Sequence, residues 1–371
     1  MNQSSPARLD FLDSLRGIAI LLVMALHYWE FTWFNLSIGP VDLNFLVTTG
    51  SIGVTLFFFV SGFCLYLSYD RAPDKLLYAR KRFFKIVPSY ALAIAIILAV
   101  FGAPAWGFRE FAWQLMTHAL FVHNWWPDTY GSINGVFWSL AVEVQFYFLF
   151  PFFYPWVKRR PLTTLGLTYL GAQIARLYIS ATNPNPLDQY LNQLPPLLDV
   201  FVAGIASAHW YSLWRTGPKP WFLATPARAT AVAVAGLFLS GACFHLAHVE
   251  RYNIGIPQIQ VWLRGALLIS FSTLSLGSAF ALGTWNRLLA NPLLRFLSRI
   301  SYNLYIWHQF IGLKFFEAKI PEYVGDPHED KAWRYKFLIL AISVSILVSW
   351  LITIVFEEPI LRAGTRKRPA A

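Results

Sequence analysis

Apolar segments of roughly twenty residues recur along the whole chain, separated by short polar stretches. An apolar helix needs about 20 residues to cross the roughly 30 Å hydrocarbon layer of a bilayer. The pattern predicts ten membrane-spanning helices, at residues 12–33, 44–69, 86–104, 136–157, 161–180, 194–214, 226–248, 258–282, 296–318 and 334–357. The aromatic segment 111–126 is a candidate for a further short or re-entrant segment, because it is too brief to span comfortably.

Composition agrees with this pattern. Hydrophobic residues make up 56% of the 371 residues and charged residues only 13%, whereas a soluble domain has about 25% charged residues. The expected fold class is therefore an all-α, polytopic integral membrane protein. We expect a single membrane domain over residues 1–371, with no appended soluble domain.

The net charge of +11 is explained by where the basic residues lie. With a cytoplasmic N-terminus, most of the Lys and Arg residues fall on the inner side of the predicted spans. This positive-inside bias predicts an inner (plasma) membrane protein with both termini in the cytoplasm. Because the basic groups lie at successive span ends and not on one folded face, the pattern argues against nucleic-acid binding.

The first predicted span contains two ionisable residues, Arg16 and His27. Such residues are costly in hydrocarbon, so they usually face a protein interior, a cavity or a reaction. Their spacing of eleven positions is about three helical turns, which places them roughly on one face. His27 is therefore a candidate for proton transfer and Arg16 for holding an anion. A helix-start arginine with a hydrogen-bonded core histidine would explain the same pattern.

A carboxylate lies in the apolar segment 135–151. A carboxylate taken out of water is costly unless it has a partner, so packing alone explains Glu143 poorly. We therefore expect Glu143 to be functional. Trp138 and Tyr147 lie on either side of it and would supply an aromatic wall.

Two further segments admit both a functional and a structural interpretation. In the basic run at 78–90, Arg82 and Lys85 are three positions apart and present their cations together, which suits a phosphorylated ligand. Topology alone would also explain these charges, and we expect Pro88 to break the following helix. In the segment 50–63, small residues favour close helix packing, while Ser61 could instead line a substrate tunnel.

A second histidine, His308, lies deep in the predicted span 296–318, with Tyr302 and Tyr305 nearby. Histidines in two different spans favour an interior polar site. Metal binding is not expected, because His245 and His248 form only a weak pair without a recognised ligand spacing.

Six segments, taken together, resemble the acyltransferase-3 family of membrane O-acyltransferases, which includes enzymes that acetylate bacterial surface polysaccharides and some that acylate antibiotics. They are LDSLRGIAILLVMALH, GVTLFFFVSGF, RKRFFKIVPSY, FWSLAVEVQFYFLFP, SRISYNLYIWH and FEEP, in family order from residue 9 to residue 359. Two positions depart from the family pattern. Thr55 stands where the family often has Asp, and Lys85 stands where it often has Arg, which keeps the charge but gives up bidentate geometry. We expect no C-terminal hydrolase-like domain of the kind that some members carry.

The resemblance implies transfer of an acyl group, expected to be acetyl, from cytoplasmic acyl-CoA to a hydroxyl of a carbohydrate or lipid-linked glycan. His27 would be the general base with Glu143 orienting or charge-balancing the site, although transient acylation of His27 stays open. Arg82 and Lys85 would bind the phosphates of the coenzyme A donor. Arg16 would position the donor or stabilise an oxyanion. The candidate substrate-binding residues are Ser61, Trp138, Tyr302 and His308. Acetyl-CoA would be a co-substrate, no permanently bound cofactor is expected, and the other partners would be membrane lipids.

Two other classes of function stay open at this point. A transporter for an anionic glycan or metabolite would use the same buried charges to line a path, but the sequence has no related halves and no matching broken helices. A non-catalytic membrane sensor or scaffold is the third class. Consumption of acetyl-CoA by the purified protein separates the enzyme from both alternatives.

Overall fold

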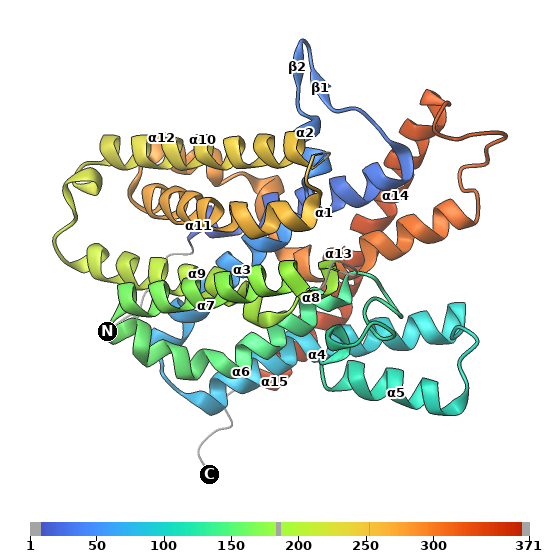
Figure 1. Ribbon diagram of the computed structural model, residues 1–371, viewed down its shortest axis with the longest axis horizontal. Coiled ribbons are helices and arrows are strands. Elements are labelled where there is room, and N and C mark those ends of the chain that lie inside the picture. Colours follow the sequence, from blue (N-terminus) through green and yellow to red (C-terminus); the bar gives the residue numbers. More distant parts are fainter. Residues whose placement is uncertain (1–8, 183–186, 252, 366–371) are drawn as a thin grey trace.

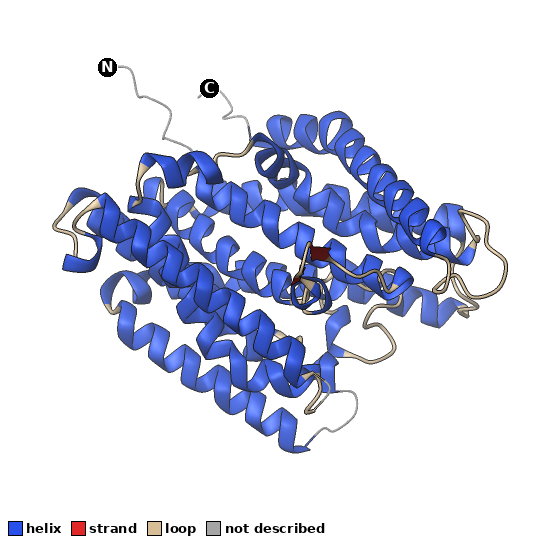
Figure 2. Cartoon of the chain, turned by 90° about the horizontal axis from the view of Figure 1, so that it is seen from above, coloured by secondary structure: helices blue, strands red, loops and turns tan. Residues whose placement is uncertain are grey.

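The chain is built almost entirely of helices in the computed structural model, which describes residues 9–182, 187–251 and 253–365 (Figures 1 and 2). This confirms the all-α class. Within the described ranges, ten helices have 20 residues or more, and each overlaps one of the ten predicted spans. They are α1 (Asp10–Thr32), α3 (Ile52–Arg71), α4 (Lys75–Phe101), α6 (Phe137–Arg159), α7 (Pro161–Thr182), α9 (Leu194–Thr216), α10 (Pro226–Glu250), α11 (Ile256–Phe280), α13 (Pro292–Glu317) and α14 (Lys331–Ile352).

Short elements connect the long helices. The helical ones are α2 (Asn44–Thr48), α5 (Phe108–Ala119), η1 (His123–Trp125), α8 (Leu187–Leu191), η2 (Trp221–Leu223), α12 (Gly283–Leu289), η3 (Thr353–Glu357) and α15 (Glu358–Thr365). Two short strands, β1 (Ser37–Ile38) and β2 (Val41–Asp42), form an antiparallel hairpin in which Ser37 pairs with Asp42. The hairpin projects from the helical body in Figure 1.

Seven helices in the described part of the chain are long and apolar enough to cross a membrane. They are α1, α3, α4, α6, α10, the residues 258–280 of α11, and the stretch 331–365 that begins with α14. The protein is thus a multi-pass membrane protein by length and composition of its helices. The predicted count of ten spans stays a prediction.

One predicted span is not a continuous helix. The span expected at 44–69 is interrupted, because α2 ends at Thr48 and α3 begins at Ile52. Gly50 lies in this break, where an added Cβ would come within 2.1 Å of the Leu22 carbonyl oxygen of α1. The backbone therefore approaches α1 too closely for any side chain at this position.

Pro88 does not break its helix, contrary to expectation. Helix α4 runs through it from Lys75 to Phe101, since a proline removes one helical hydrogen bond while the neighbouring turns keep theirs. Asp74 caps the start by accepting hydrogen bonds from the backbone N–H groups of Leu76 and Leu77. The basic run therefore lies on the first turns of α4 and not in a loop.

The centre of the bundle is formed by α1, which packs against both α3 and α13, and by α9, which packs against α3. At the α3–α9 contact, a Cβ on Gly62 would lie 2.2 Å from the Phe201 carbonyl oxygen, and a Cβ on Gly204 would lie 2.0 Å from the Phe59 carbonyl oxygen. The expected close packing of the small residues in 50–63 is confirmed. This packing places the middle of α3 next to the polar residues of α1 and α6.

Two histidines in the connection between α4 and α6, His118 of α5 and His123 of η1, are fully buried. The rings of His118 and His123 stack with their centroids 4.1 Å apart, and neither Nε2 atom has a hydrogen-bond partner among the described residues. Burial lowers the pKa of His118 from 6.5 to about 4 and that of His123 from 6.5 to about 3. Because the folded pKa lies below the unfolded value, the pair stabilises the fold while neutral, and this stabilisation is lost as the pH falls below 6.5.

We expect the Tm of the purified protein in detergent to fall as the pH is lowered from 7 towards 4.5. In the variant His118→Phe the fall should be smaller, because a Phe ring can still stack on His123 while one protonatable group is gone. Thermal unfolding of both proteins across this pH range measures the effect. Parallel Tm curves for the variant and the wild type would contradict the prediction.

Candidate active site

His27 lies near the C-terminal end of α1, one turn before Glu30. Its Nδ1 atom is 2.9 Å from Oε2 of Glu30 and 3.1 Å from the amide nitrogen of Gln309 on α13. A carboxylate at this distance favours the tautomer that carries its proton on Nδ1, and Nε2 then keeps its lone pair. The imidazole is thus held in an orientation suited to accepting a proton at Nε2.

His308 lies directly beside His27, with their ring centroids 5.2 Å apart. It is fully buried, and its Nδ1 lies 2.8 Å from the Leu304 carbonyl oxygen one turn earlier on α13. The structure thus brings the two predicted intramembrane histidines together from different helices. A direct contact of His308 with substrate stays a prediction.

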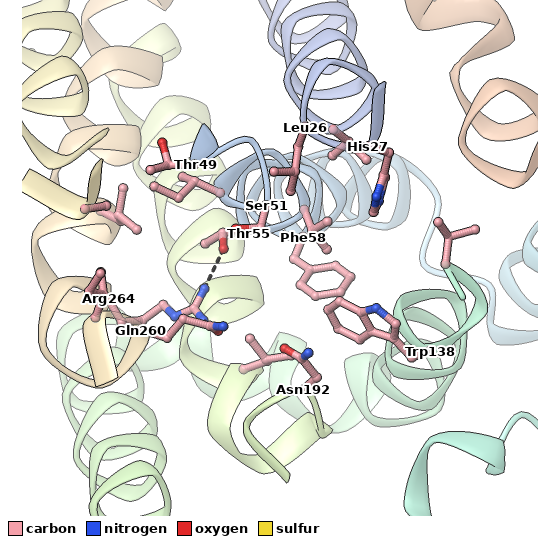
Figure 3. A pocket seen from close by; sticks show the side chains of 18 of the residues that line it. Leu26, His27, Thr49, Ser51, Thr55, Phe58, Trp138, Asn192, Gln260 and Arg264 are labelled. Atoms are coloured by element: carbon pink, nitrogen blue, oxygen red, sulfur yellow. Dashed lines mark hydrogen bonds between the residues drawn. The ribbon is translucent and has the colours of Figure 1, made fainter. Parts of the chain in front are cut away.

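His27 lines a cavity of about 360 Å³, called here the His27 cavity. Its lining includes His27, Glu30, Thr55, Trp138, Gln260 and Arg264. Figure 3 shows His27 and Trp138 on one side of this space and Gln260 and Arg264 on the other. The cavity therefore combines an apolar aromatic wall with polar groups, as ligand pockets commonly do.

Glu143 lines a second, smaller cavity of about 40 Å³, called here the Glu143 cavity. Its carboxylate accepts hydrogen bonds from the Ser61 hydroxyl at 2.7 Å and from the Tyr147 hydroxyl at 2.5 Å. Arg16 and Tyr302 line the same cavity. The Nε atom of Arg16 is buried and has no hydrogen-bond partner among the described residues.

The two cavities adjoin, because Val54, Phe58 and Tyr305 line both of them. His27 pairs through Nδ1 with the Glu30 carboxylate, and the Gln309 side chain lies against the same ring atom. Glu143 interacts instead with the Ser61 and Tyr147 hydroxyls. The predicted site residues thus fall into two neighbouring groups, with Trp138 beside His27 and with Arg16, Ser61 and Tyr302 beside Glu143. A charge-balancing role for Glu143 stays a prediction.

The two predicted phosphate-binding cations lie next to the Glu143 group. The guanidinium carbon of Arg82 is 5.4 Å from the centre of the Tyr147 ring, and Nζ of Lys85 is 5.7 Å from the centre of the Tyr302 ring. Lys85 also forms an ion pair with Glu357, a buried carboxylate near the C-terminal end of the chain. Lys85 therefore has a structural partner, whereas the buried Nε of Arg82 has no hydrogen-bond partner within the described residues.

The family model of the acyltransferase-3 type, described as an acyltransferase domain, matches residues 9–356, which is nearly the whole chain. The chain belongs to the acyltransferase-3 family. No solved structure matches it.

Several curated relatives of this acyltransferase are enzymes by name. It is 28% identical to the acyltransferase MdmB of Streptomyces mycarofaciens, over 98% of this chain and 94% of that protein. It is 24% identical to the peptidoglycan O-acetyltransferase OatA of Listeria monocytogenes, over 95% of this chain but 56% of that protein. Nodulation protein 10 of Rhizobium leguminosarum is 25% identical over 84% of each chain. This chain thus spans about half the length of OatA and nearly all of MdmB.

Three polar residues of the acyltransferase site were not predicted. Glu30 could have been identified from its spacing, since it follows His27 by three positions and so lies on the same helix face. Arg264 could have been identified too, because it is an ionisable residue within a predicted span, the same signal that identified Glu143. Gln309 stands next to His308 in sequence, and only the packing of α13 against α1 reveals its contact with His27.

Proposed function

We propose that this membrane acyltransferase moves an acetyl group from acetyl-CoA to a hydroxyl group of a carbohydrate acceptor. The observation that carries the proposal is the hydrogen bond between His27 and Glu30 at the wall of a cavity of about 360 Å³. A carbohydrate acceptor is supported by the names of the OatA relatives, which are O-acetyltransferases, one of them acting on peptidoglycan.

In the proposed reaction, His27 acts as the general base. Nε2 takes the proton of the acceptor hydroxyl as its oxygen attacks the carbonyl carbon of the thioester. The new C–O bond forms, the C–S bond breaks, and the thiolate of coenzyme A leaves and takes up the proton from His27. Glu30 stabilises the imidazolium that exists between these two proton transfers, and Arg16 is proposed to stabilise negative charge on the carbonyl oxygen.

The orientation of the chain in the membrane predicts the sides from which donor and acceptor enter. We place both chain termini in the cytoplasm of a plasma membrane, because the basic residues gather at the corresponding span ends. On that orientation the first turns of α4, with Arg82 and Lys85, face the cytoplasmic side, where acetyl-CoA is available. His27 and Glu30 lie near the opposite end of α1, so the acceptor would enter the His27 cavity from the outer side.

Neutralising Arg82 should raise the KM for acetyl-CoA about tenfold while changing kcat little, because phosphate contacts far from the reacting bond bind substrate and transition state alike. The variant Arg82→Gln tests this, and Lys81→Gln, a neighbouring cation on the same helix, is the matched control. Lys85→Gln should be combined with Glu357→Gln, since removing Lys85 alone leaves a buried carboxylate unpaired.

Donor KM is measured on purified, quantified protein at two salt concentrations. The apparent donor affinity of the wild type should weaken with salt, as an ionic phosphate contact does. An unchanged KM in Arg82→Gln would move the coenzyme site elsewhere, and Arg16 would be the next residue to substitute.

The proposed function as a whole is tested by incubating the purified protein with acetyl-CoA and an isolated surface glycan. We expect release of free coenzyme A thiol together with a mass increase of one acetyl group on the glycan. Comparing the glycans of a deletion strain with those of its parent identifies the natural acceptor. A protein that consumes no acetyl-CoA under these conditions would be a transporter or a scaffold.

A further inference from the structure

The His27 cavity contains a buried cation that the proposed mechanism does not use. Arg264 of α11 is 3% exposed and lies across the cavity from His27 (Figure 3). Its guanidinium donates hydrogen bonds to the Thr55 hydroxyl at 2.5 Å and to the Gln260 side-chain oxygen at 2.8 Å. Both partners are neutral, and the Nε atom has no hydrogen-bond partner among the described residues.

A second buried arginine shows what a structural guanidinium looks like in this fold. Arg176 is 1% exposed, and it pairs with both carboxylate oxygens of Asp199, at 2.9 and 3.2 Å. Asp199 also interacts electrostatically with Arg264. Arg176 thus has a carboxylate in direct contact, whereas Arg264 forms no ion pair within the described residues.

This arrangement leaves Arg264 without a carboxylate in contact, since Glu30, which also lines the cavity, pairs with His27. A buried cation with only neutral partners is costly, because hydrogen bonds to neutral groups recover little of its lost hydration. A ligand that brings a negative charge into the cavity would supply the missing counter-ion. Arg264 is well suited to this, since its planar fork matches the oxygens of a carboxylate or a phosphate.

We propose that Arg264 binds an anionic group of the acceptor, so that the enzyme acts on an acidic carbohydrate that carries a carboxylate or phosphate. Thr55 and Gln260 hold the guanidinium in place on one side of the cavity, and His27 meets the acceptor hydroxyl on the other. Binding of the anion at Arg264 would thereby fix which hydroxyl of the sugar reaches His27. This inference rests on the proposed function for the identity of the acceptor, but not for the anion site itself.

Binding of three small glycosides to the purified protein tests the proposal by calorimetry, without any need for turnover. Methyl β-D-glucuronide carries a carboxylate where methyl β-D-glucoside carries a hydroxymethyl group, and α-D-glucose 1-phosphate carries a phosphate. We expect at least one of the two anionic sugars to bind about tenfold or more tightly than the glucoside, because a hydrogen-bonded charge is worth about that much. The tighter of the two anions distinguishes a carboxylate acceptor from a phosphorylated one.

The variant Arg264→Gln should bind all three sugars equally, and Arg264→Lys should recover part of the preference for the anion. A second pair of variants leaves Arg264 in place. Thr55→Asp puts a carboxylate where the threonine hydroxyl now accepts from Arg264, so it supplies an internal counter-ion and should abolish the preference. Thr55→Asn has nearly the same shape without the charge and should keep it.

Equal binding of the three sugars to the wild type, or no binding of any, would overturn the anion site. So would a preference for the anion that survives in both Arg264→Gln and Thr55→Asp. Acetyl transfer to the neutral glucoside at the same rate as to the anionic sugars would leave the proposed function standing and remove this inference. Anion binding in a protein that consumes no acetyl-CoA would leave the anion site standing and remove the proposed function.

Discussion

Replacing His27 with alanine should lower the rate of acetyl transfer by about 10²-fold or more, while the protein still inserts and purifies like the wild type. General bases typically contribute about 10² to 10⁴ in rate. Alanine also fits an apolar helix, so the substitution removes the imidazole without placing a new polar group there. The measurement is kcat on purified protein, by release of coenzyme A thiol.

Two further variants make the His27 result specific. His245→Ala removes an exposed histidine of α10 and should leave the rate within about twofold of the wild type, as surface substitutions usually do. Glu30→Gln keeps a hydrogen-bonding group beside His27 but removes the charge, and should lower the rate about tenfold or more. Activity within a few fold of wild type in His27→Ala would remove His27 from the mechanism.

Replacing Glu143 with glutamine should also impair transfer severely, by about 10²-fold. The carboxylate accepts hydrogen bonds from Ser61 and Tyr147 in a cavity that Arg16 also lines. Its negative charge can therefore balance the positive charge of Arg16. Glutamine keeps the shape and one acceptor oxygen but loses the charge. Transfer rates and gel-filtration profiles of Glu143→Gln and Glu143→Ala, with Glu317→Gln as an exposed control, measure the effect.

The comparison of the two Glu143 variants decides what the residue does. If glutamine retains activity and alanine does not, Glu143 is a hydrogen-bonding strut between α6 and α3, and its proposed electrostatic role is wrong. If both variants are inactive but fold normally, the charge itself is required. Loss of folding in both would mean that Glu143 serves stability and not the reaction.

Much of the fold was predictable because the membrane imposes a strong local constraint. An apolar run of fixed length is a property of consecutive residues, so each of the ten predicted spans overlaps a long helix. The break at Gly50 and the continuation of α4 through Pro88 were not predictable in the same way. The first depends on contact with Leu22 of α1, and the second on neighbouring turns that tolerate one missing hydrogen bond.

The sequence identified some residues of the candidate site but not their hydrogen-bond partners. An ionisable residue inside an apolar segment can be recognised from the sequence, because a charge in hydrocarbon is costly however the helix packs. His27 and Glu143 were found in this way. The sequence by itself thus determined a helical membrane protein of the acyltransferase-3 type with buried polar groups. It could not determine their partners, since hydrogen bonds join residues from helices far apart in the chain.

Tertiary packing alone placed Gln309 against His27, Ser61 against Glu143, Glu357 against Lys85, and Thr55 against Arg264. Packing also separated His27 and Glu143 into two adjoining cavities, which no spacing along one helix could indicate. The physical reason is the range of the interactions involved. Hydrophobic burial is read from neighbouring residues, whereas a hydrogen bond or ion pair exists only when the folded chain brings its two atoms to within about 3 to 4 Å.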